Sequence, residues 1–258
     1  MTTSPGTVQP PPAVRQALAA IDRCLPSEAA AWLIRCCDEA ASTPAVLRAF
    51  PAVGRRLGRG PLPGCDPAGG YGWTVDDAGR TRLLIAASAS RDGDALAALA
   101  GQLYRHGDAA ERRGVLRALD ALPLGERGLP LLRDALRTND ARLVAAAAGG
   151  QYAARLLPDA DLAQAVLKCL FTGVPLAAVA AVPGRVTPEL ARMTADFAHE
   201  RVAAGRDVPE DAWLILCGEP EAVAAAGLPA ELDSAVADRR AAARRFFAAQ
   251  PAVSGEET

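Results

Sequence analysis

Apolar side chains recur at three- and four-residue steps along most of this chain. Leu18, Ile21 and Leu25 show this spacing near the start, and Trp32 and Leu33 continue it. The period predicts amphipathic helices, whereas runs of alternating β-branched residues, typical of strands, are not found. After these first segments, we expect helices at about 44–57, after Thr74, and near 92–106, 111–122, 128–137, 140–148, 159–171, 187–204, 209–217 and 229–249.

Several of the predicted helices have recognisable start signals. Thr74 is followed by Asp76 and Asp77, which places a hydroxyl cap and two acidic groups at the positive end of a helix dipole. Comparable signals are Ser27 before Glu28, Asp92, Asp108 with Glu111 as a capping box, Asn139, and Thr187 before Pro188 and Glu189.

These helices divide the chain into five segments. Residues 1–12 and 251–258 are expected to be disordered tails. Residues 13–57 form an N-terminal helical subdomain, the Gly- and Pro-rich residues 58–72 a loop, and residues 73–250 the main helical domain. The predicted fold class is all-α, built either from stacked antiparallel helical hairpins in a HEAT- or armadillo-like solenoid or as an irregular helical bundle.

The composition narrows the classes of function. The chain has 258 residues, of which 50% are hydrophobic, and its 28 basic and 30 acidic residues give a net charge of −2. This balance does not favour nucleic acid or an anionic membrane surface as a partner. No signal peptide or transmembrane segment is evident, so we expect a cytoplasmic protein with no transmembrane segment and no nucleic-acid partner.

Cysteine and histidine offer little material for a metal centre. The six cysteines show no C-x-x-C pair, and His106 and His199 are the two histidines. We therefore expect reduced thiols, no metal site and no cofactor.

The first two candidate functional segments contain basic residues next to helices. Arg137 and Asn139 lie in the sequence LRTN at a junction between two predicted helices, where Asn139 either caps the next helix or helps Arg137 to bind an anion. Lys168 is the one lysine of the chain and lies in an apolar stretch. Its ammonium group either reaches out to water or, if desolvated beside a cleft, acts as a base, a Schiff-base amine or a cation for phosphate.

The third segment is the predicted helix near 187–204. At 100° per residue, Arg192, Asp196 and His199 form one stripe, opposite an apolar face. Asp196 and His199 are either part of a structural ion-pair network or a general acid–base pair. Arg201 falls on the apolar face, so it needs a carboxylate from another helix or a polar cavity beside it.

These same segments resemble a known family. The sequences LRTN, QYAARLLPDADLAQAVLKCLFTG and ELARMTADFAHERVAAGR, followed by Trp213, are similar to the EboA-domain family, and the resemblance runs from about Trp32 to about Gly218. It implies an all-helical protein that acts in the biosynthesis or movement of a small metabolite beside operon-encoded pathway enzymes. At positions that match the family pattern, the chain keeps Arg137, Asn139, Lys168, Arg192, Asp196, His199, Glu200 and Arg201.

The chain also departs from the family pattern. Gly150, Gln151 and Ala153 surround Tyr152 where the family typically reads N-P-Y-P, and Phe197 replaces a tyrosine. If those groups line a pocket, the ligand of this chain differs from that of other members.

Two hypotheses about function follow. In the first, the chain is a helical binding or scaffolding module for a cyclitol- or isoprenoid-type metabolite and its pathway enzymes. In the second, it is an enzyme acting on a phosphorylated or polyhydroxylated metabolite. Its catalytic residues would be Lys168, Asp196 and His199, and its ligand-binding residues Arg137, Asn139, Arg192, Glu200 and Arg201.

Overall fold

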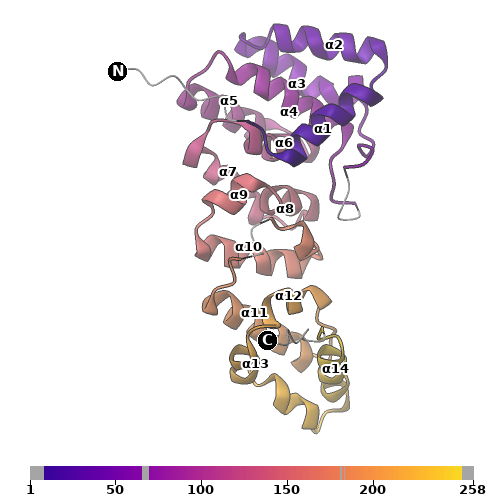
Figure 1. The fold of residues 1–258 in the computed structure, drawn as a ribbon, viewed down its shortest axis with the longest axis vertical. Helices are drawn as coiled ribbons and strands as arrows, with labels where there is room; N and C mark the ends of the chain where they lie inside the picture. Colours follow the sequence, from indigo (N-terminus) through magenta and orange to yellow (C-terminus); the bar gives the residue numbers. More distant parts are fainter. Residues whose placement is uncertain (1–8, 66–69, 181, 183, 252–258) are drawn as a thin grey trace, which may run out of the picture. The chain divides into compact units, whose positions relative to one another are not determined.

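The protein is all-α. The computed structural model describes residues 9–65, 70–180, 182 and 184–251, and these residues form α-helices and short 3₁₀ helices (Figure 1). Across the described residues, the extended pairing is confined to one isolated bridge between Pro61 and Thr74. The predicted fold class is therefore confirmed.

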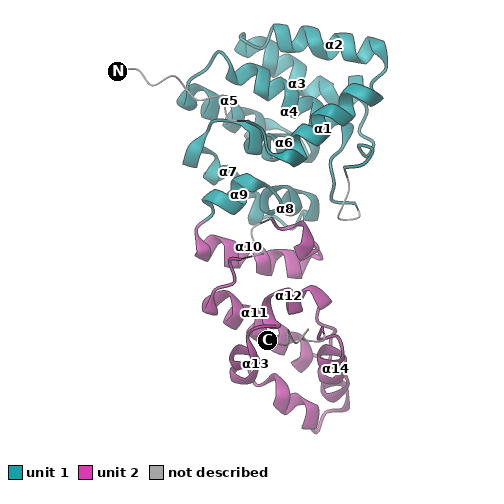
Figure 2. Cartoon of the chain, in the orientation of Figure 1, with its two compact units in different colours: residues 1–157 teal, residues 158–258 magenta. Residues whose placement is uncertain are grey.

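The chain forms two compact units (Figure 2). Unit 1 comprises residues 1–157 and unit 2 residues 158–258, so the division falls between Leu157 and Pro158. The helices on either side of residues 58–72 pack within unit 1. Residues 1–8 and 252–258 of the predicted tails lie outside the described residues, and the first helix already begins at Pro12.

Unit 1 contains nine α-helices and two 3₁₀ helices among its described residues. In chain order these are α1 (Pro12–Cys24), α2 (Ser27–Asp38), α3 (Thr43–Leu57), α4 (Val75–Ser88), α5 (Gly93–His106), α6 (Ala109–Ala118), η1 (Leu119–Ala121), η2 (Gly125–Gly128), α7 (Leu129–Leu136), α8 (Ala141–Ala148) and α9 (Gln151–Leu156).

Helix α4 is the central helix of the N-terminal part of unit 1. It packs against α1, α2, α3 and α6, so it is buried on most of its circumference. The predicted Thr74 cap is confirmed, and the structure completes it to a capping box, because the Thr74 side chain accepts from Asp77 N and Asp77 accepts from Thr74 N. Few positions of a helix enclosed in this way reach water, and the first turns of α4 carry buried charges, among them Asp76, Asp77 and Arg80.

The remaining helices extend unit 1 by pairwise packing. Helix α6 contacts α5 and α8, and α7 contacts α8, so each pair covers the apolar face of the next. A continuous core of mostly leucine and alanine runs through these pairs, with Phe50, Tyr104 and Tyr152 as its aromatic members. The abundant alanine permits close approach of neighbouring helix backbones.

Unit 2 is built around α11. Its described elements are α10 (Asp159–Thr172), η3 (Leu176–Ala178), α11 (Pro188–Ala203), η4 (Glu210–Ala212), α12 (Trp213–Leu216), α13 (Pro220–Ala225), η5 (Leu228–Asp233) and α14 (Ala237–Ala248). Helix α11 contacts α10, α12, α13, η5 and α14. Trp213 stacks on Phe246 at 4.5 Å between ring centroids, and its indole Nε1 donates to the Phe246 carbonyl at 3.0 Å.

Several predicted boundaries need correction. The predicted helix at 229–249 is two elements, η5 and α14, separated at residues 234–236. The side chain that caps α8 belongs to Asp140 rather than Asn139, since its Oδ1 accepts from Arg142 N at 2.9 Å and from Leu143 N at 3.2 Å. Ser27 is the first residue of α2 rather than its cap. The caps at Asp92, Asp108 and Thr187 are confirmed.

Candidate anion-binding site

A pocket of about 430 Å³ opens on unit 1 where α5, α6 and α7 meet. Its volume lies within the range of small-molecule sites. The residues that line it are Tyr104, Arg105, Arg112, Pro130, Leu131, Asp134 and Arg137. It thus combines three guanidinium groups with one carboxylate, one phenol and a short apolar wall.

Helix register places these side chains together. Tyr104 and Arg105 lie in the last turn of α5, and Arg112 lies in α6, whose cap Asp108 accepts from Glu111 N at 2.8 Å. On the third element, Pro130, Asp134 and Arg137 are four and three residues apart, which puts them on one face of α7 and its continuation. The opposite face of α7 buries Leu129, Leu132 and Ala135 in the core.

A chain of hydrogen bonds joins the back of the pocket to its rim. The Tyr104 hydroxyl donates to Asp134 Oδ2 at 3.0 Å, and Arg137 Nη2 donates to Asp134 Oδ1 at 3.1 Å. Tyr104 is 2% exposed, and this burial, followed by the nearby Asp134 carboxylate, raises the pKa of its phenol. Tyr104 therefore stays protonated at neutral pH and serves as a hydrogen-bond donor.

The other two arginines are placed by contacts at the end of α5. Arg112 Nε donates to the Gly107 carbonyl at 3.1 Å, and its guanidinium lies over the Tyr104 ring, 5.6 Å from the ring centroid. The Arg105 guanidinium folds back along α5, since a Cβ atom on Gly101 would lie 3.0 Å from Arg105 Nη1. These contacts use part of each guanidinium and leave further N–H donors for a ligand.

The charges of the pocket favour an anion. Three guanidinium groups face a single carboxylate, and that carboxylate already accepts hydrogen bonds from Tyr104 and Arg137. Guanidinium groups are permanently charged and bind carboxylate or phosphate oxygens in pairs. Leu131 and Pro130 offer apolar surface beside them, so the pocket suits a small molecule with an anionic group and an apolar part.

Of the eight predicted site residues, Arg137 and Asn139 belong to unit 1. Arg137 lines the pocket. Asn139 is exposed, two residues further along the chain, and is not among the residues that line the pocket. The other six residues belong to unit 2.

Arg192 and Asp196 form an exposed ion pair on α11. Arg192 Nη1 donates to Asp196 Oδ2 at 2.6 Å, and its Nη2 and Nε donate to Glu189 at 2.8 and 3.0 Å. The side chains of Arg192 and Asp196 are 57% and 50% exposed. Water screens such a pair, so it adds little to stability.

His199 is bonded to a different carboxylate from the one that its sequence spacing indicated. Its Nε2 lies 3.2 Å from Oε1 of Glu231 on η5, and Arg239 Nη2 of α14 lies 3.2 Å from the same oxygen. Glu231 is 8% exposed. The three side chains connect α11, η5 and α14.

Lys168, Glu200 and Arg201 are also placed by the structure. The Lys168 ammonium lies 5.9 Å from the ring centroid of Phe171, whose side chain is largely exposed. Glu200 is exposed on α11. Arg201 Nε donates to the Asp207 carbonyl, and its guanidinium lies over the Phe197 ring, so a backbone oxygen and an aromatic face replace the expected carboxylate or cavity.

Tyr104, Arg105, Arg112 and Asp134 were not found by sequence reasoning. They come from three helices and share no motif, so the pocket becomes visible only when α5, α6 and α7 are packed together. The one available signal is that Arg137 and Asp134 lie three residues apart, as expected for neighbours on a helix. Within the described ranges, no group of three His, Cys, Asp or Glu side chains is arranged to hold a metal ion.

The fold and this site define an all-helical protein with a cation-lined pocket of metabolite size. A family model described as metabolite traffic protein EboA matches residues 17–217. The chain therefore belongs to the EboA family, as the resemblance indicated. Comparisons with curated proteins and with solved structures find no match. None of the helices in the described part of the chain has the length and apolar character needed to cross a bilayer.

Proposed function

We propose that this EboA-family chain is a binding module that holds a small anionic metabolite in the pocket of Arg105, Arg112 and Arg137. The observation that carries the proposal is the convergence of these three guanidinium groups, from three helices, on a pocket of about 430 Å³ with one carboxylate among its lining residues. A metabolite traffic role, which the family description indicates, requires reversible binding of this kind.

The chemistry of the pocket favours binding over reaction. Arginine does not lose its proton in proteins, so none of the three cations can act as a base at neutral pH. The pKa of Tyr104 is raised, and the Asp134 carboxylate is engaged by two donors. The pocket can therefore hold a charged group and release it unchanged.

The lining residues also suggest the class of metabolite. Paired N–H donors suit a phosphate or carboxylate, and Leu131, Pro130 and the Tyr104 ring suit an apolar or cyclic body. Such a ligand agrees with a phosphorylated or carboxylated cyclitol- or isoprenoid-type compound. Transfer of that compound to and from pathway enzymes would make the chain a scaffold for those partners.

The alternative function, an enzyme using Lys168 and an Asp196–His199 pair, has less support. The Asp196 carboxylate is held by Arg192, and His199 is bonded to Glu231. An acid–base pair needs its two members to share a proton path. We therefore retain the binding module as the proposal.

Recovery of the bound metabolite tests this function. The full chain would be purified from its native host and its small-molecule content identified by mass spectrometry, in parallel with Arg137→Gln and Arg105→Gln. We expect the wild-type chain to carry an anionic compound and each variant to bind that compound at least about tenfold more weakly, the loss expected for one charge-assisted contact. Arg133→Gln changes an exposed arginine on the same helix that does not line the pocket and is the matched control.

The result can contradict the proposal in two ways. A compound that binds equally well to Arg137→Gln and Arg105→Gln would place the ligand elsewhere on the chain. Turnover of the recovered compound, lost in His199→Ala with unchanged binding in the Arg137 variant, would favour the enzyme.

A further inference from the structure

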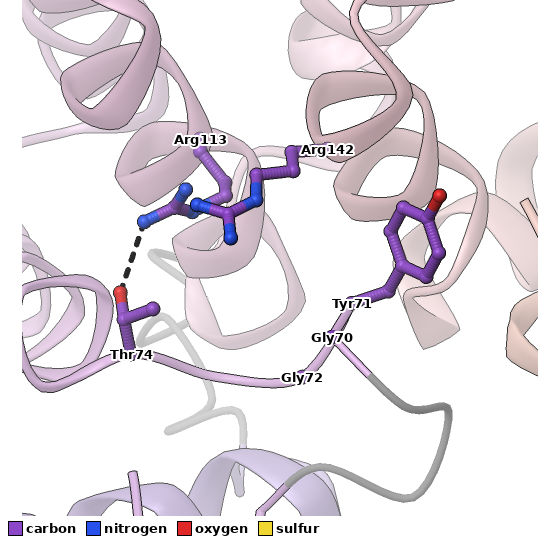
Figure 3. Close-up of a pocket in the computed structure, with 6 residues that line it drawn as sticks. All are labelled: Gly70, Tyr71, Gly72, Thr74, Arg113 and Arg142. Carbon is purple, nitrogen blue, oxygen red and sulfur yellow. Dashed lines mark hydrogen bonds between the residues drawn. The ribbon is translucent and has the colours of Figure 1, made fainter. Parts of the chain in front are cut away.

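A second, smaller cavity in unit 1 is also lined by arginine. It lies between residues 70–74, α6 and α8, away from the Arg137 pocket in sequence and without any residue in common with it (Figure 3). Its lining residues are Gly70, Tyr71, Gly72, Thr74, Arg113 and Arg142. Its volume is about 10 Å³, which is room for about one water molecule or one oxygen atom of a larger group.

Arg113 forms the inner wall and is held rigidly. It is 7% exposed, its Nε donates to both oxygens of Asp77 at 2.9 and 3.0 Å, and its Nη2 donates to Thr74 Oγ1 at 3.0 Å. The same Asp77 and Thr74 close the capping box of α4. The third guanidinium nitrogen, Nη1, makes no hydrogen bond to any residue in the described ranges.

Arg142 forms the outer wall. It is the second residue of α8 and is exposed, and its guanidinium points toward that of Arg113 (Figure 3). Its side chain makes no ion pair with a carboxylate in the described part of the chain. Two guanidinium groups that approach each other repel, and an anion between them removes this repulsion.

The described lining residues include no Asp or Glu. Two buried acids lie against Arg113: Asp77 is ion-paired with it, and Asp76, the partner of Arg80, has its Oδ1 3.8 Å from Arg113 Nη2. A further cation, Arg117, lies over the Trp73 ring and donates to the Tyr71 carbonyl, so the local field at residues 71–73 is positive.

We infer that this cavity is a second binding site, specific for an oxyanion of the phosphate class. One oxygen accepts from Arg113 Nη1, the guanidinium nitrogen that Asp77 and Thr74 do not engage, and the other oxygens lie at the opening, where the exposed Arg142 side chain closes over them. Arg113 supplies a fixed charge and Arg142 a mobile one. This site does not depend on the function proposed for the Arg137 pocket.

Titration with inorganic phosphate at constant ionic strength, with chloride as the reference salt, tests the inference. Trp73 lies in the chain between the lining residues Gly72 and Thr74, so its fluorescence reports on this site. We expect phosphate to change this fluorescence and Arg142→Gln to weaken the response at least about tenfold. Arg142→Lys should retain part of the affinity, because it keeps the charge and loses the planar pair of donors.

Arg133→Gln is the matched control, since it removes the same charge from an exposed arginine that lines neither pocket. An unchanged phosphate response in Arg133→Gln together with its loss in Arg142→Gln supports the second site. Equal responses in wild type and Arg142→Gln overturn the inference. Because Arg142 is exposed, its variants should keep the wild-type melting temperature, which the same samples can verify.

Discussion

The Tyr104 hydroxyl donates to Asp134 Oδ2 at 3.0 Å and thereby joins the last turn of α5 to α7. The bond orients the carboxylate so that its other oxygen receives Arg137. A buried phenol therefore positions an exposed cation of the candidate anion site. Under the proposed function, this pair of residues would couple stability to ligand binding.

The pKa of Tyr104 predicts a stability loss at alkaline pH. Burial and Asp134 raise this pKa above its usual value of 10.0, so the folded state retains the proton after the unfolded state releases it. The resulting stabilisation is complete below pH 10 and declines as the pH rises above 10. Tyr104→Phe should cost about 1 kcal/mol at neutral pH and show a smaller decline above pH 10. Urea unfolding of both proteins across this range measures the difference, and identical pH profiles would contradict the prediction.

Arg80 should be among the most sensitive positions for folding. It is fully buried in α4, is ion-paired with Asp76, and donates to the Phe50 carbonyl at 3.3 Å. Arg80→Ala leaves a buried carboxylate without this partner and should lower the free energy of unfolding by about 3–5 kcal/mol.

The double variant Arg80→Met with Asp76→Asn removes both charges and should recover part of this loss. Chemical denaturation of Arg80→Met, Asp76→Asn and the double variant gives the coupling free energy between the two side chains. Additive losses would show that the pair is not coupled.

We expect the fold to tolerate Asp120→Asn but to be destabilised by Asp120→Ala. Its Oδ1 accepts from Tyr152 N at 2.6 Å at the start of α9, and burial raises its pKa. Asp120→Asn keeps an acceptor and removes the buried charge, so its stability at neutral pH should equal or exceed that of the wild type. Asp120→Ala leaves the Tyr152 N–H unsatisfied and should lose about 1–3 kcal/mol.

The raised pKa of Asp120 also predicts how its contribution to stability changes with pH. Because the pKa of this carboxyl is raised above 3.8 in the folded state, the protonated form is favoured by folding. The contribution of Asp120 to stability therefore falls as the pH rises above about 3.8, and Asp120→Asn should lack this fall. Thermal unfolding of the variant and wild type at acidic and neutral pH compares the two slopes.

The cysteines should differ sharply in reactivity. Cys24 and Cys217 are exposed, whereas Cys169 is fully buried and its pKa is raised by burial to about 12. Reaction requires an accessible thiolate. In the native protein, maleimide should label Cys24 and Cys217 first, and Cys169 should react only after denaturation. Peptide mapping identifies the labelled positions, and rapid native labelling of Cys169 would indicate local opening of α10.

Much of the helical layout was predictable, because helix period and caps are local properties. Thr74, Asp92, Asp108 and Thr187 cap the helices that they were expected to start. The errors concern the exact residues at which helices begin and end. Asp140 rather than Asn139 bonds the first N–H groups of α8, and the last predicted helix is interrupted at residues 234–236.

The candidate site was less predictable, because its members meet through packing. Arg137 was identified from its sequence, whereas Tyr104, Arg105 and Arg112 lie 25 to 33 residues away and share no motif with it. On α11, the spacing correctly placed Arg192 beside Asp196. The partner of His199 is instead Glu231, 32 residues further along the chain.

The sequence alone determined the all-helical class, most helix starts, the membership of the EboA family and one arginine of the pocket. These features depend on period, capping and motif, which act between residues a few positions apart. Only the tertiary structure decided which charges are buried, which carboxylates meet cations from other helices, and where several guanidinium groups face one cavity. Those outcomes depend on contacts between helices that are distant in sequence. Burial there removes water from the charged groups, so a charge without a partner would destabilise the fold.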